Sequence, residues 1–268
     1  MKVSVIITTF RRPALLVRAV RSVFSQSVAR DVQIELIVHD DDPEGSCEGT
    51  GIDDLFRTAP RSCQIVYMRR PEGPGGVAKA RNRALESSSG EWVLFLDDDD
   101  ALEDGAIEGL LAEALRQRLD FVAGGYRFLE DGVSSAATGQ PVTVPQWSYQ
   151  SLMVGNLFPI GSFLMRRSSV ASRFNPCLAT HEDWLFLLDN LEPLKVGVVP
   201  LPVLTIFESV SEGREQRNKQ GGNPQKAADY LRIYSLYPDP DLFLQRCLIL
   251  QSLGGVSIEQ LLRGKFIG

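Results

Sequence analysis

Two clusters of acidic residues follow apolar, β-branched runs in this 268-residue chain. Residues 40–42 come after the run 34–39, and residues 97–100 come after the run 92–96. In an open parallel sheet, ligands bind beyond the carboxyl ends of the strands. Adjacent carboxylates repel one another unless basic side chains or a cation compensate them, and Mg²⁺ or Mn²⁺ bound together with ligand phosphates would do so. A solvated acidic turn before the next helix is the alternative, but the position after a buried strand favours a metal.

An arginine lies on the apolar face of the helix predicted for residues 76–88. Arg81 falls within an apolar arc at helical spacing, whereas Lys79 and Arg83 lie on the opposite side. The arc consists of Val77, Ala78, Ala80, Ala84 and Leu85. A buried guanidinium needs an anion or several acceptors. It therefore either pairs with the strand-end aspartates or reaches a nucleotide or its diphosphate, and the two roles are compatible.

A third acidic group stands at the start of a short helix predicted for residues 182–190. Thr180 and Asp183 have the spacing of a capping box, and negative charge suits a helix N-terminus. Because residues 184–188 are all apolar, the helix is expected to be buried, with its acidic end at the edge of the core. Asp183 could then act as a general base in a cleft. Considered without other information, the residues favour the cap.

The periodicity of the first hundred residues alternates between that of strands and that of helices, which predicts a parallel sheet covered by helices on both faces. Strands are predicted over 3–9, 34–39, 64–68 and 92–96, and helices over 13–24 and 76–88. In the middle of the chain we expect a helix over 103–118, a strand over 121–129, a hairpin or loop over 130–146 and a strand over 161–166. Further on we expect short strands over 196–207, a polar loop over 211–224 and mainly helix in the last 45 residues.

The composition argues against several classes of protein. The chain has 28 Lys+Arg and 34 Asp+Glu, a net charge of −6, whereas nucleic-acid-binding domains are usually basic, so no nucleic-acid partner is expected. No apolar run approaches the ~20 residues that cross a bilayer, so no membrane span is expected. The four cysteines lack CxxC spacing and suggest neither a zinc site nor a disulfide framework, which makes a reducing cytoplasm the simplest compartment.

Taken in order, these segments resemble a family 2 glycosyltransferase of the GT-A type. Residues 3–10 resemble the family's opening strand, and residues 40–41 resemble its paired aspartates. Residues 76–82 resemble its GxxxARN helix, residues 90–100 its GE…FLDxDD stretch, and residues 174–184 the acceptor-side segment that ends in an ED motif. The resemblance covers about residues 1–207. It implies an α/β, GT-A fold with a Rossmann-like, mostly parallel sheet and helices on both faces, here with a C-terminal helical extension.

The resemblance also implies an inverting, metal-dependent transfer of a sugar from a nucleotide diphosphate sugar, with Mn²⁺ or Mg²⁺ as the cofactor. Asp97 and Asp99 would form the DxD pair, with Asp99 as the direct ligand of the metal. Asp183 would be the general base, with Glu182 beside it. The predicted contacts to the nucleotide sugar are Thr8, Phe10, Arg11, Asp40, Arg81, Asp97 and Asp98.

The chain departs from the family pattern in two places. A histidine that often helps to hold metal or diphosphate is missing from residues 205–211, where Glu208 could replace it or the metal could have fewer protein ligands. The QxxRW sequence and the membrane spans of processive synthases are also missing. We therefore expect the addition of a single sugar, a hexosyl transfer from a UDP-sugar to a hydroxyl of a glycan or lipid-linked acceptor, in cell-surface polysaccharide synthesis.

We expect a glycosyltransferase domain over 1–210, with a donor half over 1–100 and an acceptor half over 101–210, followed by a loop and helical extension over 211–268. Residues 211–224 are either a lid over the donor or a solvated linker. The apolar face around Leu248 and Leu250 is expected to pack on the domain, with a homodimer contact or the inner face of the membrane as alternatives.

Two other functions stay open. A nucleotidyltransferase that makes sugar nucleotides would have a related sheet, but it would usually carry a glycine-rich loop after the first strand, and residues 8–13 contain no glycine. A non-catalytic sugar-nucleotide-binding protein is disfavoured only weakly, by the acidic pair Glu182 and Asp183.

Overall fold

The structure is a computed structural model, which describes residues 1–47, 49–71, 73, 75–130, 140–144, 147–208 and 224–253. Its centre is an eight-stranded sheet with the order β3-β2-β1-β4-β7-β6-β8-β5. The strands are β1 (Lys2–Thr9), β2 (Gln33–Asp40), β3 (Cys63–Arg69), β4 (Trp92–Asp97), β5 (Ala101–Leu102), β6 (Phe121–Glu130), β7 (Phe163–Arg166) and β8 (Val196–Glu208). Only β7 and β5 run against the other strands, so the predicted mostly parallel sheet is confirmed.

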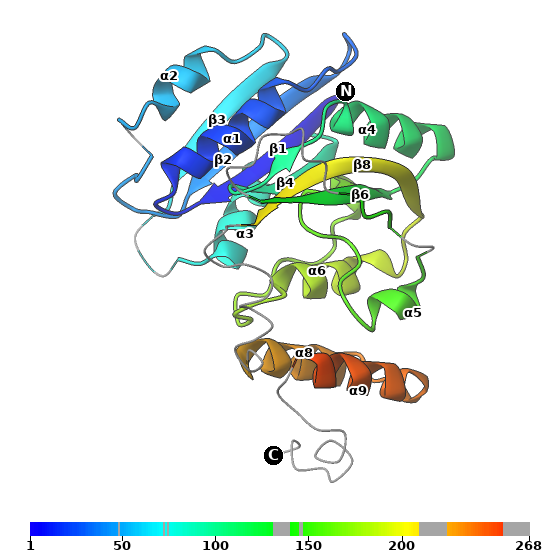
Figure 1. Cartoon of the computed structure of the whole chain (residues 1–268). Helices are drawn as coiled ribbons and strands as arrows, with labels where there is room; N and C mark the ends of the chain where they lie inside the picture. The colour runs from blue at the N-terminus through cyan, green and yellow to red at the C-terminus, as the bar shows by residue number, and fades with distance from the viewer. Residues whose placement is uncertain are drawn as a thin grey trace.

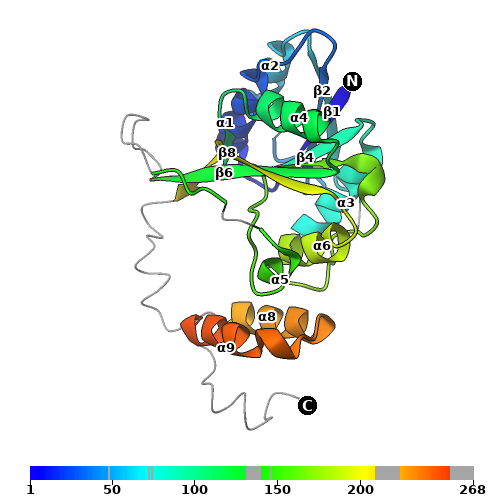
Figure 2. The same cartoon turned by 90° about the vertical axis from the view of Figure 1, so that its right-hand side faces the viewer.

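Helices cover both faces of this sheet (Figures 1 and 2). One face carries α1 (Pro13–Phe24), α2 (Ile52–Arg57) and α4 (Ala106–Gln117), and the other carries α3 (Val77–Ser87), α5 (Tyr149–Leu152) and α6 (Glu182–Leu191). Two further helices, α8 (Pro224–Leu236) and α9 (Phe243–Ser252), form a layer beyond α6. Short 3₁₀ turns span Arg167–Ser169 and Pro240–Leu242.

The central strands are buried on both faces, as expected for parallel strands between two helical layers. In β1 and β2, seven of the eight residues in each strand are buried. Successive side chains then enter two separate cores. Val3, Val5 and Ile7 pack with α1 and α4, whereas Ile6 packs with α3 and α6. The result is a rigid support for whatever the strand ends carry.

The structure corrects three expectations about the elements. Residues 196–207 form one long strand, β8, and not several short ones, with shifts of register opposite Ala123, Gly125 and Tyr126. Pro200 and Pro202 lie at this irregular stretch, where a missing backbone donor is tolerated. The helix expected from residue 103 begins at Ala106.

Val77 provides the third correction, because it is 41% exposed although the helical wheel placed it on the apolar side. It is the first residue of α3. The other members of the predicted arc are buried, together with Arg81.

Two segments were predicted to have irregular structure, 130–146 and 211–224, and most of each lies outside the described residues. Of residues 130–146, the described part includes Val142, which forms an antiparallel bridge with Tyr126. The loop 211–224 lies outside them except for Pro224 at the start of α8.

Within the described residues, the C-terminal extension consists mainly of α8 and α9, which agrees with the expected helical character. Its apolar face divides in two: Leu250 is buried, whereas Leu248 is 62% exposed and Leu244 is 72% exposed. Core packing therefore accounts for only part of this face. None of the described helices has the length and apolar character needed to cross a bilayer.

Candidate active site

Three strand ends carrying predicted site residues meet at one edge of the sheet. Strand β1 lies between β2 and β4, so that Thr8 is in register with both His39 and Asp97, and Thr9 is in register with Asp40. Thr8 is buried at the end of β1. The pairing thus brings the two acidic clusters of the sequence to the same edge, where an open α/β sheet binds its ligands.

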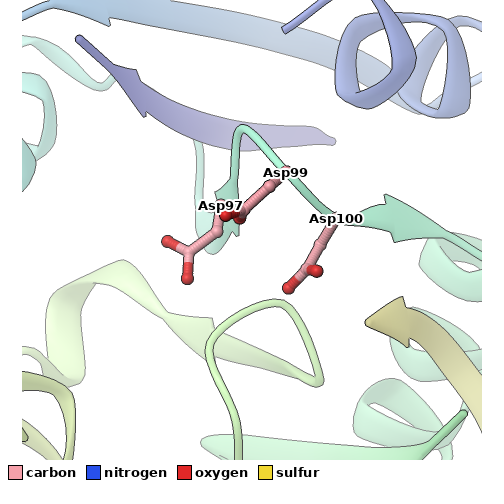
Figure 3. A group of neighbouring side chains, drawn as sticks. All are labelled: Asp97, Asp99 and Asp100. Carbon is pink, nitrogen blue, oxygen red and sulfur yellow. The ribbon is translucent and has the colours of Figure 1, made fainter. Parts of the chain in front are cut away.

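The turn from β4 to β5 holds a group of three carboxylates (Figure 3). Asp97, Asp99 and Asp100 each offer a carboxylate oxygen, and these oxygens lie within 4.8 Å of one another. The sequence prediction included Asp97 and Asp99 but missed Asp100, although it belongs to the same acidic run. Burial and the neighbouring Asp97 and Asp99 raise the pKa of Asp100 to about 8. Three crowded carboxylates are the donor set that a hard divalent cation prefers, so these residues fit Mg²⁺ or Mn²⁺.

The remaining carboxylate of the run, Asp98, has a different environment. It is fully buried, accepts a hydrogen bond from Thr9 Oγ1 at 2.6 Å and pairs with Arg12 Nη2 at 2.5 Å. Burial raises its pKa to about 6. Arg12 also bonds to Asp99 Oδ2 at 2.9 Å. Asp98 is thus engaged within the protein, where it ties the end of β1 to the acidic turn, and its predicted contact with a nucleotide sugar stays a prediction.

Arg12 was missed as a site residue, although it follows the first strand directly. Its neighbour Arg11 adopts a left-handed backbone conformation with φ 56° and bonds through Nε to Asp42 Oδ2 at 2.7 Å. Phe10 is 48% exposed, with the Arg11 guanidinium carbon 5.1 Å from its ring centre. Phe10 and Arg11 therefore present accessible surface at the strand ends, consistent with their predicted use in binding.

The second acidic cluster organises the loop after β2. Asp40 is fully buried and accepts hydrogen bonds from Ser46 Oγ, Cys47 N and Tyr67 Oη at 2.9–3.2 Å. Asp41 accepts a hydrogen bond from Gly76 N at 2.6 Å, which links this loop to the start of α3. Asp40 thus has a structural role that the sequence did not suggest, and its contact with the nucleoside stays a prediction.

Arg81 joins the carboxylate turn to the ED motif. Its Nη2 bonds to Asp97 Oδ1 at 2.6 Å, and its Nη1 bonds to Glu182 Oε1 at 2.5 Å. Burial opposes the charge, but Asp97 and Glu182 outweigh it, so the pKa of the guanidinium is raised. The predicted ion pair with a strand-end aspartate is confirmed. The second partner, 101 residues away in the sequence, was not expected.

Asp183 lies beside this bridge at the start of α6. Its Oδ2 accepts a hydrogen bond from Asn156 Nδ2 at 2.7 Å, and its Oδ1 accepts one from Trp184 N at 2.8 Å. Burial and the neighbouring Glu182 raise its pKa to about 6. A carboxylate with such a pKa can accept a proton near neutral pH. Asn156 was not identified from the sequence, because nothing around it indicates that it reaches α6.

The capping box predicted for residues 180–183 is wrong. The N-cap of α6 is His181, in a left-handed conformation with φ 61°, and no side chain caps the helix. Thr180 Oγ1 instead donates to Asp229 Oδ2 at 2.8 Å, in the C-terminal extension. Tertiary partners therefore displaced the local cap, and Asp183 is available for another role.

The end of β8 reaches the carboxylate group. Phe207 N donates to Asp100 Oδ1 at 3.2 Å, and Glu208 follows as the last residue of the strand. Phe207, in the segment where the family often has a histidine, therefore contacts one of the three carboxylates. Whether Glu208 takes the place of that histidine stays a prediction.

Comparisons with known proteins identify the family of the chain. The family model described as "Glycosyl transferase family 2" matches residues 4–173, and the chain therefore belongs to family 2 of the glycosyltransferases. One relative is the poly(ribitol-phosphate) β-N-acetylglucosaminyltransferase TarP of Staphylococcus aureus. It is 31% identical over 89% of this chain and 73% of its own length.

A second relative is the GalNAc(5)-diNAcBac-PP-undecaprenol β-1,3-glucosyltransferase of Campylobacter jejuni. It is 34% identical over 42% of this chain, and the match spans about a third of its own length, 34%. Among solved structures, S. aureus TarS residues 1–349 in complex with UDP superimposes with a TM-score of 0.64 at 19% identity, covering 88% of this chain and 65% of that 1–349 chain. This likeness confirms the GT-A fold.

Proposed function

We propose that this protein is an inverting glycosyltransferase that transfers one sugar from a UDP-sugar to a hydroxyl of a glycan or lipid-linked acceptor. The observation that carries the proposal is the Arg81 bridge between Asp97 and Glu182. Through this bridge, a carboxylate group suited to a cation and diphosphate lies next to Asp183, whose pKa of about 6 suits a general base. A donor side and an acceptor side thus meet in one site.

In the proposed reaction, Asp183 removes the proton of the acceptor hydroxyl as the hydroxyl oxygen attacks the anomeric carbon. The bond between that carbon and the diphosphate oxygen breaks, and its electron pair leaves with the nucleoside diphosphate. Asp183 ends the step protonated and returns its proton to solvent. Because there is a single displacement from the face opposite the leaving group, the configuration at the anomeric carbon inverts.

We propose that Asp97, Asp99 and Asp100 hold the divalent cation, with Asp99 as its most accessible ligand. When bound, the cation supplies Lewis-acid stabilisation of the charge on the diphosphate. Arg81 holds Asp97 in place and balances the charge of Glu182, and Arg12 does the same for Asp98 and Asp99. The predicted contacts of Thr8, Phe10, Arg11 and Asp40 to the donor belong to this proposal.

The relatives support the choice of donor and acceptor class. TarS has been solved with UDP, and TarP is by its name a β-N-acetylglucosaminyltransferase acting on poly(ribitol phosphate). The Campylobacter enzyme acts on an undecaprenol-linked acceptor. We therefore propose a role in cell-surface polysaccharide synthesis, in the cytoplasm and in contact with a lipid-linked intermediate at the inner face of the membrane.

The test is the variant Asp183→Asn. Transfer is measured as UDP release from a panel of UDP-sugars, with poly(ribitol phosphate) and undecaprenyl-diphosphate-linked glycans as acceptors. We expect kcat to fall by about 10²–10⁴-fold, because the amide cannot accept the proton, whereas calorimetry shows unchanged binding of UDP with Mn²⁺. Asp54→Asn, the same exchange at an exposed carboxylate of α2 on the opposite face of the sheet, is the control. Undiminished turnover in Asp183→Asn would refute the base assignment.

A further inference from the structure

The C-terminal extension contacts both segments that support the proposed base. Asp229 and Tyr234 in α8 and Arg246 in α9 are all buried, with exposed fractions of 3%, 8% and 6%. Within the described residues, none of the three bonds to the central sheet. Their partners are the residues just before α6 and the turn just after α5, which lead to Asp183 and Asn156.

The first contact fixes the entry into α6. Asp229 Oδ2 accepts hydrogen bonds from both Thr180 N, at 2.9 Å, and Thr180 Oγ1, at 2.8 Å. Because Thr180 Oγ1 gives its proton to Asp229, the bond of 2.7 Å between Thr180 Oγ1 and His181 Nδ1 needs a proton on Nδ1. A chain of hydrogen bonds thus holds His181 in its left-handed conformation, two residues before Asp183.

Aromatic rings reinforce the same entry. Tyr230 of α8 lies with its ring centre 4.7 Å from that of His181 and 4.7 Å from that of Trp184. These two residues flank Glu182 and Asp183 in the sequence. The side chains on either side of the acidic pair are therefore packed against one side chain of the extension.

The second contact fixes the turn that carries Asn156. Three successive carbonyl groups at the end of α5 accept hydrogen bonds from three different helices. Trp184 Nε1 of α6 bonds to Leu152 O at 2.7 Å, Arg246 Nη2 of α9 bonds to Met153 O at 3.1 Å, and Tyr234 Oη of α8 bonds to Val154 O at 2.7 Å. Asn156 follows two residues later.

The amide of Asn156 is itself held in one orientation. Its Oδ1 accepts a hydrogen bond from Phe158 N at 3.1 Å, which directs Nδ2 to Asp183 Oδ2. The position of the Asp183 carboxylate therefore depends on two segments, the entry into α6 and the turn that carries Asn156, and the extension restrains both.

We propose that α8 and α9 belong to the catalytic unit, with Asp229, Tyr234 and Arg246 as positioning residues that aim Asp183 at the acceptor hydroxyl. The inference rests on the proposed role of Asp183. It also replaces the expected division between a catalytic domain over 1–210 and an appended extension. Displacing a base by about 1 Å can lower the rate about 10²-fold, so losing these bonds should reduce turnover without weakening donor binding.

The experiment compares Asp229→Ala, Asp229→Asn and Tyr234→Phe with the matched control Tyr237→Phe. This control loses a phenol bond from the extension to Asp189, which lies further along α6 and in neither of the two segments. We expect kcat to fall at least tenfold in Asp229→Ala and several-fold in Tyr234→Phe, with unchanged affinity for UDP and Mn²⁺. Asp229→Asn should recover most of the rate, because its amide oxygen can still accept both Thr180 bonds. Tyr237→Phe should behave as the wild type.

Hydrogen exchange of the peptide over residues 178–185 provides a readout that needs no activity. It should be faster in Asp229→Ala and unchanged in Tyr237→Phe. Wild-type kcat in folded Asp229→Ala and Tyr234→Phe would overturn the inference, as would equal losses in Tyr234→Phe and Tyr237→Phe. If Asp229→Ala does not fold, Tyr234→Phe and Asp229→Asn decide. If the wild type transfers no sugar, the proposed function fails, and the exchange measurement alone tests the positioning.

Discussion

At the scale of single residues, the chemistry of this site depends on hydrogen bonds between side chains that are far apart in the sequence. Asp183 has one such partner, Asn156, and Arg81 has two, Asp97 and Glu182. A donor to a carboxylate stabilises its charged form and lowers its pKa, whereas burial acts in the opposite direction. The balance between these two effects leads to a prediction for each of the two residues.

The first concerns pH. The pKa of Asp183, raised to about 6 by burial and Glu182, predicts that kcat falls as the pH drops below about 6, because the protonated base cannot accept the acceptor's proton. Asn156→Ala removes a donor to the charged form, so the pKa rises further and the acid limb moves to higher pH. The kcat profile between pH 4.5 and 8, with Asp54→Asn as control, measures the shift. An acid limb that stays in place or moves to lower pH contradicts the prediction.

The second concerns stability. In Arg81→Met the carboxylate of Glu182 stays buried without its cation, which should lower the free energy of unfolding by about 3 kcal/mol. The side chain of Asp97 is 36% exposed, so water can solvate its charge. Glu182 therefore accounts for most of the loss in stability. Adding Glu182→Gln to Arg81→Met should recover part of it. Urea unfolding of the single and double variants measures these free energies. If the losses in Arg81→Met and Glu182→Gln simply add in the double variant, Arg81 and Glu182 do not stabilise the fold as a pair.

At the scale of elements, the site depends on how closely the strands and their connections approach one another. Gly90 precedes β4, and a Cβ there would lie 2.6 Å from Ser4 N and 2.6 Å from Ser4 Oγ in β1. A side chain at this position would push apart the two strands that carry Thr8 and Asp97.

We therefore expect Gly90→Ala to lower the free energy of unfolding by about 1–3 kcal/mol, because the clash is with backbone. Gly109 in α4 is the matched control. A Cβ there would meet only Leu201 Cδ1, at 3.6 Å, and alanine is the better helix former, so Gly109→Ala should stabilise by about 0.5–1 kcal/mol. Thermal melts compare the two, and equal stability of both variants would contradict the close approach at Gly90.

At the scale of the whole molecule, a net charge of −6 would discourage a diphosphate unless the acidity itself binds a cation. The group of Asp97, Asp99 and Asp100 concentrates carboxylates at the strand ends for that purpose. A ligand that binds only the folded state stabilises the whole domain, so the melting temperature reports on the site.

We expect UDP with Mn²⁺ at a hundred times its Kd to stabilise the wild type by about 2.7 kcal/mol, which corresponds to a rise in Tm of about 5–10 °C. Treatment with EDTA should abolish the rise, and Asp99→Ala should not show it. Asp104→Ala, which removes an exposed carboxylate a few residues later, should respond like the wild type. A full response to UDP in the presence of EDTA would argue against the metal.

Much of this fold was predictable because strand and helix periodicities are local. The apolar runs that end in acidic residues are β2 and β4, and the amphipathic pattern with Arg81 on its apolar side is α3. The prediction failed where tertiary partners compete with local rules: Thr180 bonds to Asp229 and does not cap α6, and residues 196–207 form one strand despite two prolines.

The sequence by itself determined which side chains stand at the ends of the strands and what class of ligand they suit, because these properties depend on residues a few positions apart. Only the tertiary structure decided that Arg81 bridges Asp97 and Glu182, and that Asp100 completes the carboxylate group. It also decided that Asn156 bonds to Asp183 and that Asp229 bonds to the segment just before α6. These contacts join segments that are far apart in the sequence, and the separation reaches 101 residues for Arg81 and Glu182. Their formation depends on the order of the strands and the packing of α6 against α8, which no local pattern encodes.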